Sequence, residues 1–407
     1  MSGGMLRAGA AQADITPADL TGLNAMGPDF VGLHDRTFAR AVVIENGVDA
    51  VAVVSADVLE LGVTVDLRAR IAAATGIPAG AILLAPTHTH NAPRGGLTPA
   101  GGLSRAASAE SLAYTDALFD AILDAVVRAQ NAAVPARIGV GTGRVDVNIN
   151  RDVPRDGTWR LGQNPDGPSD KTLTVVAVHD ADDRPIATLL GYAVHPTAAL
   201  GTRMLSADVA GAAASAVSEA LDAPTLWLPG SLGDQAVRGS LEAARTGGDD
   251  LTVDEVFALV DTQGRTIADE ALRVAAAIDE WRDAADLSGR EAALGWPSKP
   301  GTDLPPDMHQ EELDLVALRL TALRIGDVVL LGVGGEVTTA AAAEIMAAAV
   351  APHPVLVSMA NERLGYLADD DAFALGTFAA RGCPIQPGWV PAAADVLARL
   401  AAERTTA

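Results

Sequence analysis

The chain has 407 residues, 49% of them hydrophobic and 3% aromatic, and it carries a formal net charge of -23. This length allows two ordinary domains or one large one, and we expect a single domain over 1–407 because neither an internal repeat nor a linker divides the chain. The acidic balance argues against nucleic acids and anionic membrane surfaces as partners, since both select for basic patches.

The features that report on cellular location are few. The single cysteine, Cys383, excludes an internal disulfide. Residues 1–20 lack the positive stretch and apolar run of a secretory signal, and no apolar run approaches the roughly 18 residues of a membrane span. We therefore expect a cytoplasmic protein without stable membrane insertion. The oligomeric state is left open, with a homo-oligomer as one option.

Hydrophobic patterning predicts an alternation of strands and helices. Short apolar runs bounded by turn residues predict strands at 40–45, 51–55, 81–85, 137–147, 172–179, 186–194, 226–228, 312–324, 327–333 and 354–358. Apolar residues at helical spacing predict helices at 63–75, 111–132, 209–221, 253–282 and 338–350. Polar stretches rich in Gly and Pro predict loops at 91–110, 148–170 and 284–310. The pattern indicates an α/β protein with mixed sheets and flanking helices, and the first two loops are expected to shape a binding site.

Several of the predicted strands run into a residue that can bind a metal. These residues are His88 after 81–85, His195 after 186–194, Asp234 after 226–228 and Glu336 after 327–333. Ligand sites in α/β folds collect at strand ends. We therefore expect a metal site at the C-terminal ends of these strands.

The segment Thr87-His88-Thr89-His90 holds two of the seven histidines. Such a pair on its own leaves two readings equally open, exposed loop histidines or metal ligands. A catalytic zinc site uses about three protein ligands and keeps one position for water, whose pKa the ion lowers to about 7. Together, His88, His195 and Glu336 would form a site of two histidines and one carboxylate, which suits zinc.

Short motifs follow one another in order through nearly the whole chain. They are residues 8–17, Gly32-Leu33-His34-Asp35, Ala39-Arg40-Ala41, Thr87-His88-Thr89-His90, Asn150-Arg151, Ala193-Val194-His195-Pro196-Thr197, Gly233-Asp234, Gly335-Glu336-Val337-Thr338-Thr339 and Gly365-Tyr366. This ordered set resembles the catalytic N-terminal domain of the neutral/alkaline (non-lysosomal) ceramidase family.

The resemblance implies a set of site residues and a reaction. It implies one zinc ion per chain, held by His88, His195, Glu336 and Tyr366. Tyr366 could instead serve as a hydrogen-bond donor, because tyrosine rarely binds zinc. The resemblance places His90 beside the reacting carbonyl, as an acid or an oxyanion donor, and Arg151 at the reacting end of a small-molecule substrate. The implied activity is hydrolysis of an amide bond by metal-activated water.

Five further residues could lie at the site or support it. They are His34, Asp57, Asp208, Asp234 and Phe378. A ligating histidine usually donates its second ring nitrogen to a partner, and Asp57 or Asp208 could be that partner. A surface or capping role is equally open for each aspartate, and a structural hydrogen bond is equally open for His34.

The chain departs from the ceramidase pattern around the expected metal site. Phe378 stands where the family has a second tyrosine, Gln235-Ala236 replaces a serine-containing stretch, and Asn91-Ala92-Pro93 replaces Ser-Gly-Pro. The family's C-terminal immunoglobulin-like domain and its secretion signal are also expected to be absent. These departures favour a smaller N-acylated compound over ceramide. Two alternatives stay open: an ester or lactone hydrolase with the same zinc site, and a non-catalytic metal-binding homologue.

Overall fold

The computed structural model describes residues 4–96, 107–240, 251–300, 309–310 and 315–403. Its largest sheet has nine strands. Eight of them form the path β13 (Thr225–Pro229), β11 (Pro185–Tyr192), β10 (Thr172–Asp180), β7 (Val134–Arg144), β2 (Arg7–Asp14), β4 (Phe38–Glu45), β5 (Ala50–Ala56) and β6 (Ile82–Pro86), and β15 (Trp281–Arg282) pairs with β7. The pairs β5–β6 and β11–β13 are parallel, and the other neighbours are antiparallel.

This sheet folds over on itself, so its two ends face each other. β13, at one end of the path, packs against β4, β5 and β6 at the other end, and the backbone N–H of Trp227 donates to Ser55 Oγ at 3.2 Å. Alternate residues of the middle strands point to opposite faces, so that Leu189 joins the core between the two halves while Leu190 joins the core beneath the helices.

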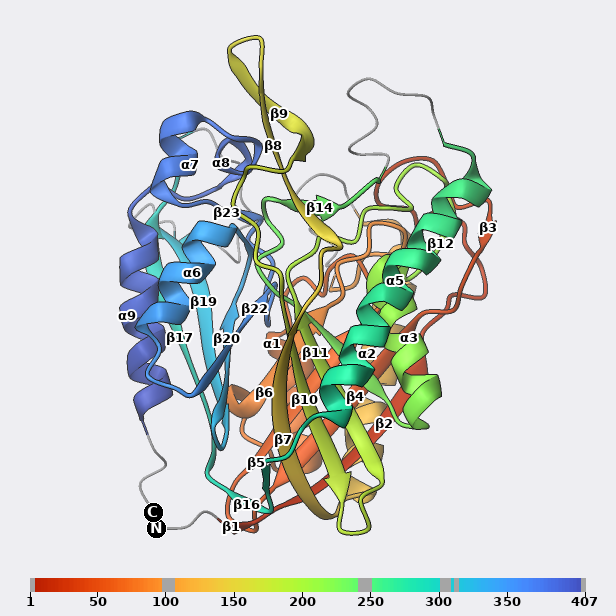
Figure 1. The fold of residues 1–407 in the computed structure, drawn as a ribbon, viewed down its shortest axis with the longest axis vertical. Coiled ribbons are helices and arrows are strands. Elements are labelled where there is room, and N and C mark those ends of the chain that lie inside the picture. Colours follow the sequence, from red (N-terminus) through yellow and green to blue (C-terminus); the bar gives the residue numbers. More distant parts are fainter. Residues whose placement is uncertain (1–3, 97–106, 241–250, 301–308, 311–314, 404–407) are drawn as a thin grey trace.

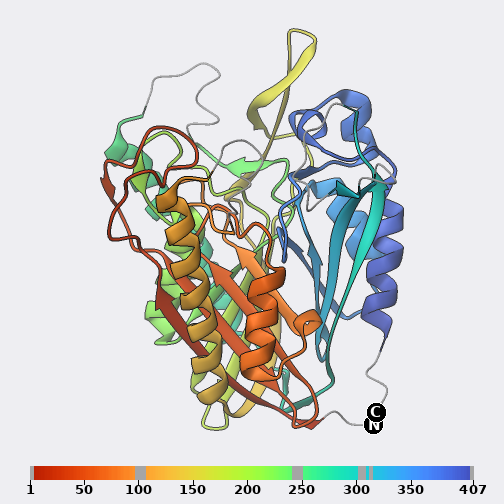
Figure 2. The same cartoon turned by 180° about the vertical axis from the view of Figure 1, so that it is seen from behind.

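Helices cover both outer sides of the folded sheet (Figures 1 and 2). On one side α2 (Ala109–Asn131) packs against β2 and β4, with α1 (Val65–Thr75) beside it. On the other side α5 (Val253–Ala276) packs against β7 and β10, and α3 (Asp208–Leu221) packs against α5 and β13. No helix in the described part of the chain is both long and apolar enough to cross a membrane.

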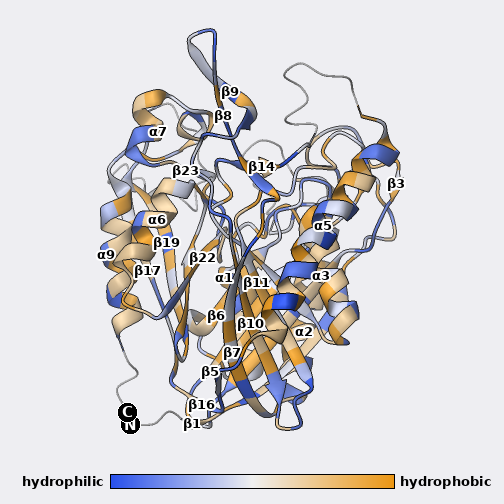
Figure 3. Cartoon of the chain, in the orientation of Figure 1, coloured by the Kyte–Doolittle hydropathy of each residue, from blue (hydrophilic) through white to orange (hydrophobic). Residues whose placement is uncertain are grey.

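The C-terminal part forms a second layer of sheet and helix. Its sheet contains β17 (Leu287–Pro297), β19 (Leu315–Ile325), β20 (Val328–Val333) and β22 (His353–Ser358), with β18 (His309–Gln310) paired to β19. Two helices, α6 (Thr339–Ala348) and α9 (Trp389–Ala402), share a buried apolar core with this sheet. Figure 3 shows the hydrophobic residues concentrated on the sheets and on the inward faces of the helices.

The smaller elements lie mainly in the connections. They are the pairs β1 (Gly4–Met5) with β16 (Ala284–Ala285), β3 (Gly32–Leu33) with β12 (Met204–Leu205) and β21 (Glu336–Val337) with β23 (Tyr366–Leu367); the three-stranded unit β14 (Gln235–Val237), β8 (Asn148–Arg155) and β9 (Thr158–Asn164); the 3-10 turn Ala79–Ala81; and the helices α7 (Asp370–Leu375) and α8 (Phe378–Gly382). The β8–β9 hairpin projects beyond the rest of the molecule (Figure 1).

The predicted mixed α/β architecture is confirmed. The hairpin around Asn46-Gly47 has the register Glu45↔Ala50, and the helix predicted over 63–75 ends at Gly76, whose φ of 76° is the left-handed conformation that glycine adopts at a helix end. The buried strand before the histidine pair is also present as β6, and all five of its residues are buried.

Three predictions about secondary structure are wrong. Residues 148–170, predicted as a loop, contain the β8–β9 hairpin, which turns at Asp156 and Gly157 with positive φ angles. Residues 284–310, also predicted as a loop, contain the eleven-residue strand β17. The helix predicted to reach 282 ends at Ala276. The missed strands β8, β9 and β17 mix polar residues or glycine with apolar ones, so they lack the apolar run that predicts a buried strand. Residues 97–106 and 301–308 of the predicted loops lie outside the described residues.

Candidate active site

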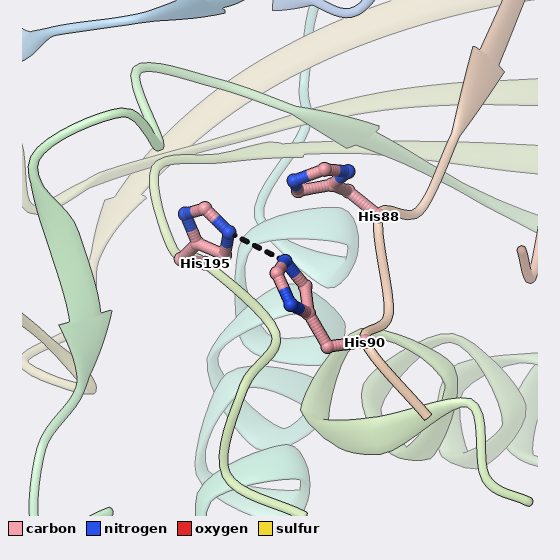
Figure 4. A group of neighbouring side chains, drawn as sticks. All are labelled: His88, His90 and His195. Atoms are coloured by element: carbon pink, nitrogen blue, oxygen red, sulfur yellow. Dashed lines mark hydrogen bonds between the residues drawn. The ribbon is translucent and has the colours of Figure 1, made fainter. Parts of the chain in front are cut away.

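Three histidines from two connections meet at one point (Figure 4). His88 and His90 follow β6, and His195 follows β11. Ring nitrogens of the three residues lie within 4.8 Å of one another, and His90 Nε2 is 2.9 Å from His195 Nε2. The folding of the large sheet brings these connections together, although β6 and β11 are far apart along its path.

The backbone around His88 fixes the direction of its ring. The residue has φ 65°, a left-handed conformation that is uncommon for non-glycine residues and occurs often at functional sites. Its N–H donates to Val58 O at 3.1 Å, and its Nδ1 lies 2.7 Å from Leu59 O. A carbonyl oxygen only accepts, so Nδ1 carries the proton and the lone pair of Nε2 faces the cluster.

His195 is held in the same way by a different carbonyl. Its Nδ1 lies 3.1 Å from Leu232 O, which again leaves Nε2 without a proton. His90 therefore donates from its own Nε2 to His195 Nε2. Burial is the largest cause that holds the pKa of both His90 and His195 well below its usual value, and neighbouring positive charges, Arg151 among them, lower it further. The two rings are therefore neutral at pH 7, the form that binds metals.

Glu336 brings a carboxylate to this cluster from the C-terminal part of the chain. It begins β21, which pairs in parallel with β23 so that Glu336 stands opposite Tyr366. Its Oε2 is 3.7 Å from His88 Nε2. Burial alone would raise the pKa of this carboxyl, but nearby positive charge, that of Arg363 and Arg151 included, lowers it below its usual value. Glu336 is therefore ionised at neutral pH.

The two facing atoms of His88 and Glu336 fit a shared metal ion. Both side chains are buried, and neither His88 Nε2 nor Glu336 Oε2 has a hydrogen-bond partner within the described residues. A buried polar atom without a partner costs about 1–3 kcal/mol, so native proteins rarely leave two of them facing each other. Two ligands about 2.0–2.1 Å from one tetrahedral zinc stand roughly 3.4 Å apart, close to the separation seen here. Imidazole and carboxylate also suit zinc chemically.

Arg151 and Tyr366 form a hydrogen-bonded pair beside these residues. Arg151 belongs to β8 and is only 1% exposed. Its Nη2 donates to Tyr366 Oη at 3.1 Å and to Gly233 O at 2.9 Å. The ring of Phe378 meets the Tyr366 ring edge-on, with centroids 5.6 Å apart. The guanidinium is therefore fixed in place by Gly233, on the connection between β13 and β14, and by Tyr366 in β23.

Asp234 anchors the turn behind Arg151. Its backbone O accepts from the Arg151 N–H at 2.9 Å. Its Oδ1 accepts from the backbone N–H and the hydroxyl of Thr339 and from Gln235 Nε2. Burial raises the pKa of this carboxyl to about 6, although these hydrogen bonds oppose the shift. Asp234 therefore ties β14, β8 and the start of α6 together, and through Arg151 it supports the site.

The structure places the other two aspartates on backbone and arginine groups. Asp57 Oδ2 accepts from Arg40 Nη1 at 2.8 Å and from the backbone N–H of Phe38 at 2.9 Å. Asp208 accepts from the backbone N–H groups of Ala199 and Val209. In both His88 and His195 the Nδ1 atom lies against a main-chain carbonyl. The expectation that Asp57 or Asp208 orients one of these rings is therefore wrong, because the main chain does so.

His34 contacts residues away from the three histidines. Its Nδ1 pairs with Asp35 Oδ2 at 2.8 Å, and its ring stacks on Phe257 with centroids 3.6 Å apart. Asp35 also accepts from Ser206 Oγ and from the backbone N–H of Ala207. These contacts join the segment that follows β3 to the segment that follows β12.

Several groups that support the site could not be recognised from the sequence. The carbonyls of Leu59 and Leu232 orient two histidines, but a main-chain oxygen leaves no signature in the sequence. The charged residues Glu60, Arg94 and Arg363 were also missed. Only their positions in the sequence could have pointed to the two arginines, because Arg94 follows the histidine motif closely and Arg363 shortly precedes Tyr366.

Comparison with known proteins identifies the family. The family described as "Neutral/alkaline non-lysosomal ceramidase, N-terminal" matches residues 6–227, and the chain belongs to this family. Neutral ceramidases A and B of Dictyostelium discoideum are 29% identical to it over 196 and 139 residues. These matches span 43% and 30% of this chain but only 26% and 18% of the relatives' own lengths.

Solved structures agree on the fold. A ceramidase described as complexed with C2 has a TM-score of 0.78 at 20% identity, over 98% of this chain and 75% of that one. The neutral ceramidase from Pseudomonas aeruginosa gives the same TM-score and identity, over 98% of this chain and 74% of its own. This chain therefore has the fold of those ceramidases along almost its whole length.

Proposed function

We propose that this protein is a zinc-dependent amidohydrolase that cleaves the amide bond of an N-acylated small molecule. One observation carries the proposal: His88 Nε2 and Glu336 Oε2 are buried, face each other at 3.7 Å and have no hydrogen-bond partner in the described chain. Membership of the ceramidase family supports an amide as the bond that is cleaved.

Four residues would hold the ion. They are His88, His195 and Glu336, with Tyr366 opposite Glu336 as the fourth. Bound there, zinc would lower the pKa of a water molecule to about 7 and polarise the substrate carbonyl. His195 and His88 each keep an unprotonated Nε2 toward the cluster, because their Nδ1 protons are bound by carbonyl oxygens.

Arg151 would stabilise the negative charge that develops on the carbonyl oxygen. Its guanidinium is buried and is held by Gly233 O and Tyr366 Oη, so it needs no reorganisation during the reaction. A fixed donor of this kind typically contributes about 10²–10³ in rate.

His90 would move the proton that the leaving amine requires. The Nε2–H of His90 points at His195 Nε2, the atom that would bind the ion, so this hydrogen bond would give way to the metal, whereas the buried Nδ1 of His90 has no hydrogen-bond partner in the described residues. That nitrogen can accept a proton and deliver it to the amine as the amide bond breaks. An ester or lactone would meet the same groups but would need no protonated amine, so His90 would matter less for such a substrate.

The proposal is tested with Glu336→Gln, which keeps the shape of the side chain and removes its charge. We expect about one zinc ion per chain in the purified protein and hydrolysis of short N-acyl amides. The variant should lose zinc and at least about a hundredfold in kcat/KM, since even the partners behind metal ligands are worth 10–100-fold. The matched control is Glu280→Gln, at a side chain that is 79% exposed.

Two results would contradict the proposal. One is purified protein that neither contains nor takes up zinc. The other is Glu336→Gln protein that hydrolyses amides as fast as the Glu280→Gln control. A panel that includes ceramide and matched esters identifies the preferred bond and shows whether a lipid is accepted.

A further inference from the structure

A second group of charges lies next to the histidine cluster. Glu60 is buried, and its carboxylate meets two guanidiniums: Arg363 Nε at 2.5 Å and Arg94 Nε at 3.4 Å. Among the described residues, this one carboxylate faces two cations. The arginine side chains are 20% and 14% exposed, against 5% for Glu60, so the positive side of the group is the accessible one.

The backbone ties each member of this group to a residue of the proposed metal site. Glu60 follows Leu59, whose carbonyl holds the His88 ring. Arg94 lies on the connection that bears His90, and it forms a β-bridge with Glu60. Arg363 lies on the connection before β23, and hydrogen bonds fix the two residues that follow it. The N–H of Leu364 donates to Gly334 O, and Gly365 O accepts from the backbone N–H of Glu336.

Two guanidiniums act on the centre of the site. The positive charges of Arg363 and Arg151 both act on His90 and on the Glu336 carboxylate. Arg151 interacts with Asp152 as well and is only 1% exposed. Arg363 is therefore the more accessible of the two guanidiniums, and bound zinc would add further positive charge. A neutral substrate would leave these charges uncompensated in a partly desolvated site, which is unfavourable.

We propose that Arg363, held by Glu60 and supported by Arg94, binds a carboxylate of the substrate, and that the substrate is an N-acylated amino acid. In such a compound the carboxylate stands one carbon from the amide nitrogen, so it reaches a cation beside the reacting centre while the carbonyl meets the metal site. Arginine suits this role because its planar guanidinium matches a carboxylate. This inference rests on the proposed amidohydrolase function and names its substrate class.

The test compares two substrates that differ in one charge. N-acylglycine carries the carboxylate, and N-acylglycinamide with the same acyl chain is neutral. We expect zinc-loaded wild-type protein to prefer N-acylglycine in kcat/KM by about tenfold or more, the value of one hydrogen bond to a charged group. Arg363→Gln should reduce that preference by about tenfold, and Arg363→Lys should restore part of it. Arg184→Gln, at an exposed arginine before β11, should keep the wild-type preference.

Binding gives a second readout that needs no turnover. N-acylglycine should raise the melting temperature of the wild-type and Arg184→Gln proteins. The increase should be smaller in Arg363→Gln. The melting temperature of Arg363→Gln without ligand shows whether that variant folds. Equal wild-type activity on both substrates, or an equal loss on both in Arg363→Gln, would overturn the carboxylate site and leave the hydrolase proposal standing. If the zinc-loaded protein hydrolyses neither these amides nor the wider panel, the proposed function fails. The binding readout still tests the carboxylate site in that case, because an undiminished thermal shift with N-acylglycine in Arg363→Gln would overturn it.

Discussion

Two buried pairs of ionisable side chains in this protein differ in how closely their facing atoms approach each other. Arg40 and Asp57 close directly on each other, with Nη1 2.8 Å from Oδ2, and both side chains are almost fully buried. His88 and Glu336 are nearly as buried, but their facing atoms stay 3.7 Å apart and have no hydrogen-bond partner among the described residues. The facing atoms of the first pair are within hydrogen-bonding distance, although Arg40 Nε and Asp57 Oδ1 have no hydrogen-bond partner in the described residues. The facing atoms of the second pair are too far apart to bond each other and are at a separation that a shared metal ion would fit.

The difference lies in what surrounds each pair. Asp57 Oδ2 also accepts the backbone N–H of Phe38, so the pair joins the start of β4 to the end of β5. The other pair joins parts of the chain that are far apart in sequence, and the backbone holds each member back: Leu59 O fixes the His88 ring, and the β21–β23 pairing fixes Glu336. A gap that rigid backbone maintains is typical of a preformed binding site.

The largest expected effect on stability comes from breaking the closed pair. Arg40→Leu should lower the free energy of unfolding by about 3–5 kcal/mol, because it leaves the Asp57 carboxylate buried without its cation. Urea unfolding measures this, with Arg184→Leu as the exposed control, which should stay within about 0.5 kcal/mol of wild type. Folded Arg40→Leu protein should still bind zinc. Loss of zinc binding in that variant would show that the two pairs are not independent.

The open pair should respond to the metal. Adding zinc to metal-depleted protein should raise the free energy of unfolding by about 2.7 kcal/mol when free zinc is a hundredfold above its Kd. His88→Ala should abolish that gain. Differential scanning calorimetry with and without a chelator measures both. A zinc-dependent gain of the same size in His88→Ala would place the ion elsewhere in the protein.

A smaller effect is expected from pH at Asp208, a buried carboxyl that belongs to neither pair. Burial raises its pKa in the folded protein from 3.8 to about 6, so the folded state binds the proton more tightly than the unfolded state. The resulting stabilisation is complete below the unfolded pKa and is lost as the pH rises through the folded one. From about pH 5 to 7 the wild type should lose roughly 1 kcal/mol relative to Asp208→Asn. A constant difference between the two proteins across that range, measured by urea unfolding, would contradict the shift.

Much of the fold could be predicted because most strands carry an apolar run. The buried strand β6 lies between clear turn residues, so the position of His88 at its end followed from the sequence. β17 could not be predicted in this way, because past its first residues buried positions give way to half-exposed and exposed ones and its sequence mixes Gly, Arg and Glu with alanine. The β8–β9 hairpin failed for the same reason, because its strands are largely polar, although the first five residues of β8 are buried.

The site was less predictable than the strands. His88 and His195 meet because the large sheet folds over and brings β13 against β5 and β6, a long-range property that no local pattern contains. The carbonyls of Leu59 and Leu232 depend on the same geometry. Arg363 is an ordinary charged residue in the sequence, and it gains significance only through the Glu60 carboxylate 2.5 Å from its Nε.

The left-handed backbone of His88 makes this position suited to chemical complementation. Alanine there would keep the unfavourable φ of 65°, whereas glycine adopts such angles freely and would relieve about 1 kcal/mol of strain. Replacing His88 by glycine would therefore remove the imidazole while leaving the path of the main chain undisturbed. The resulting void would have the size and hydrogen-bonding pattern of free imidazole, with Leu59 O ready to accept its N–H. A small molecule added to the solution could then take the place of the missing side chain.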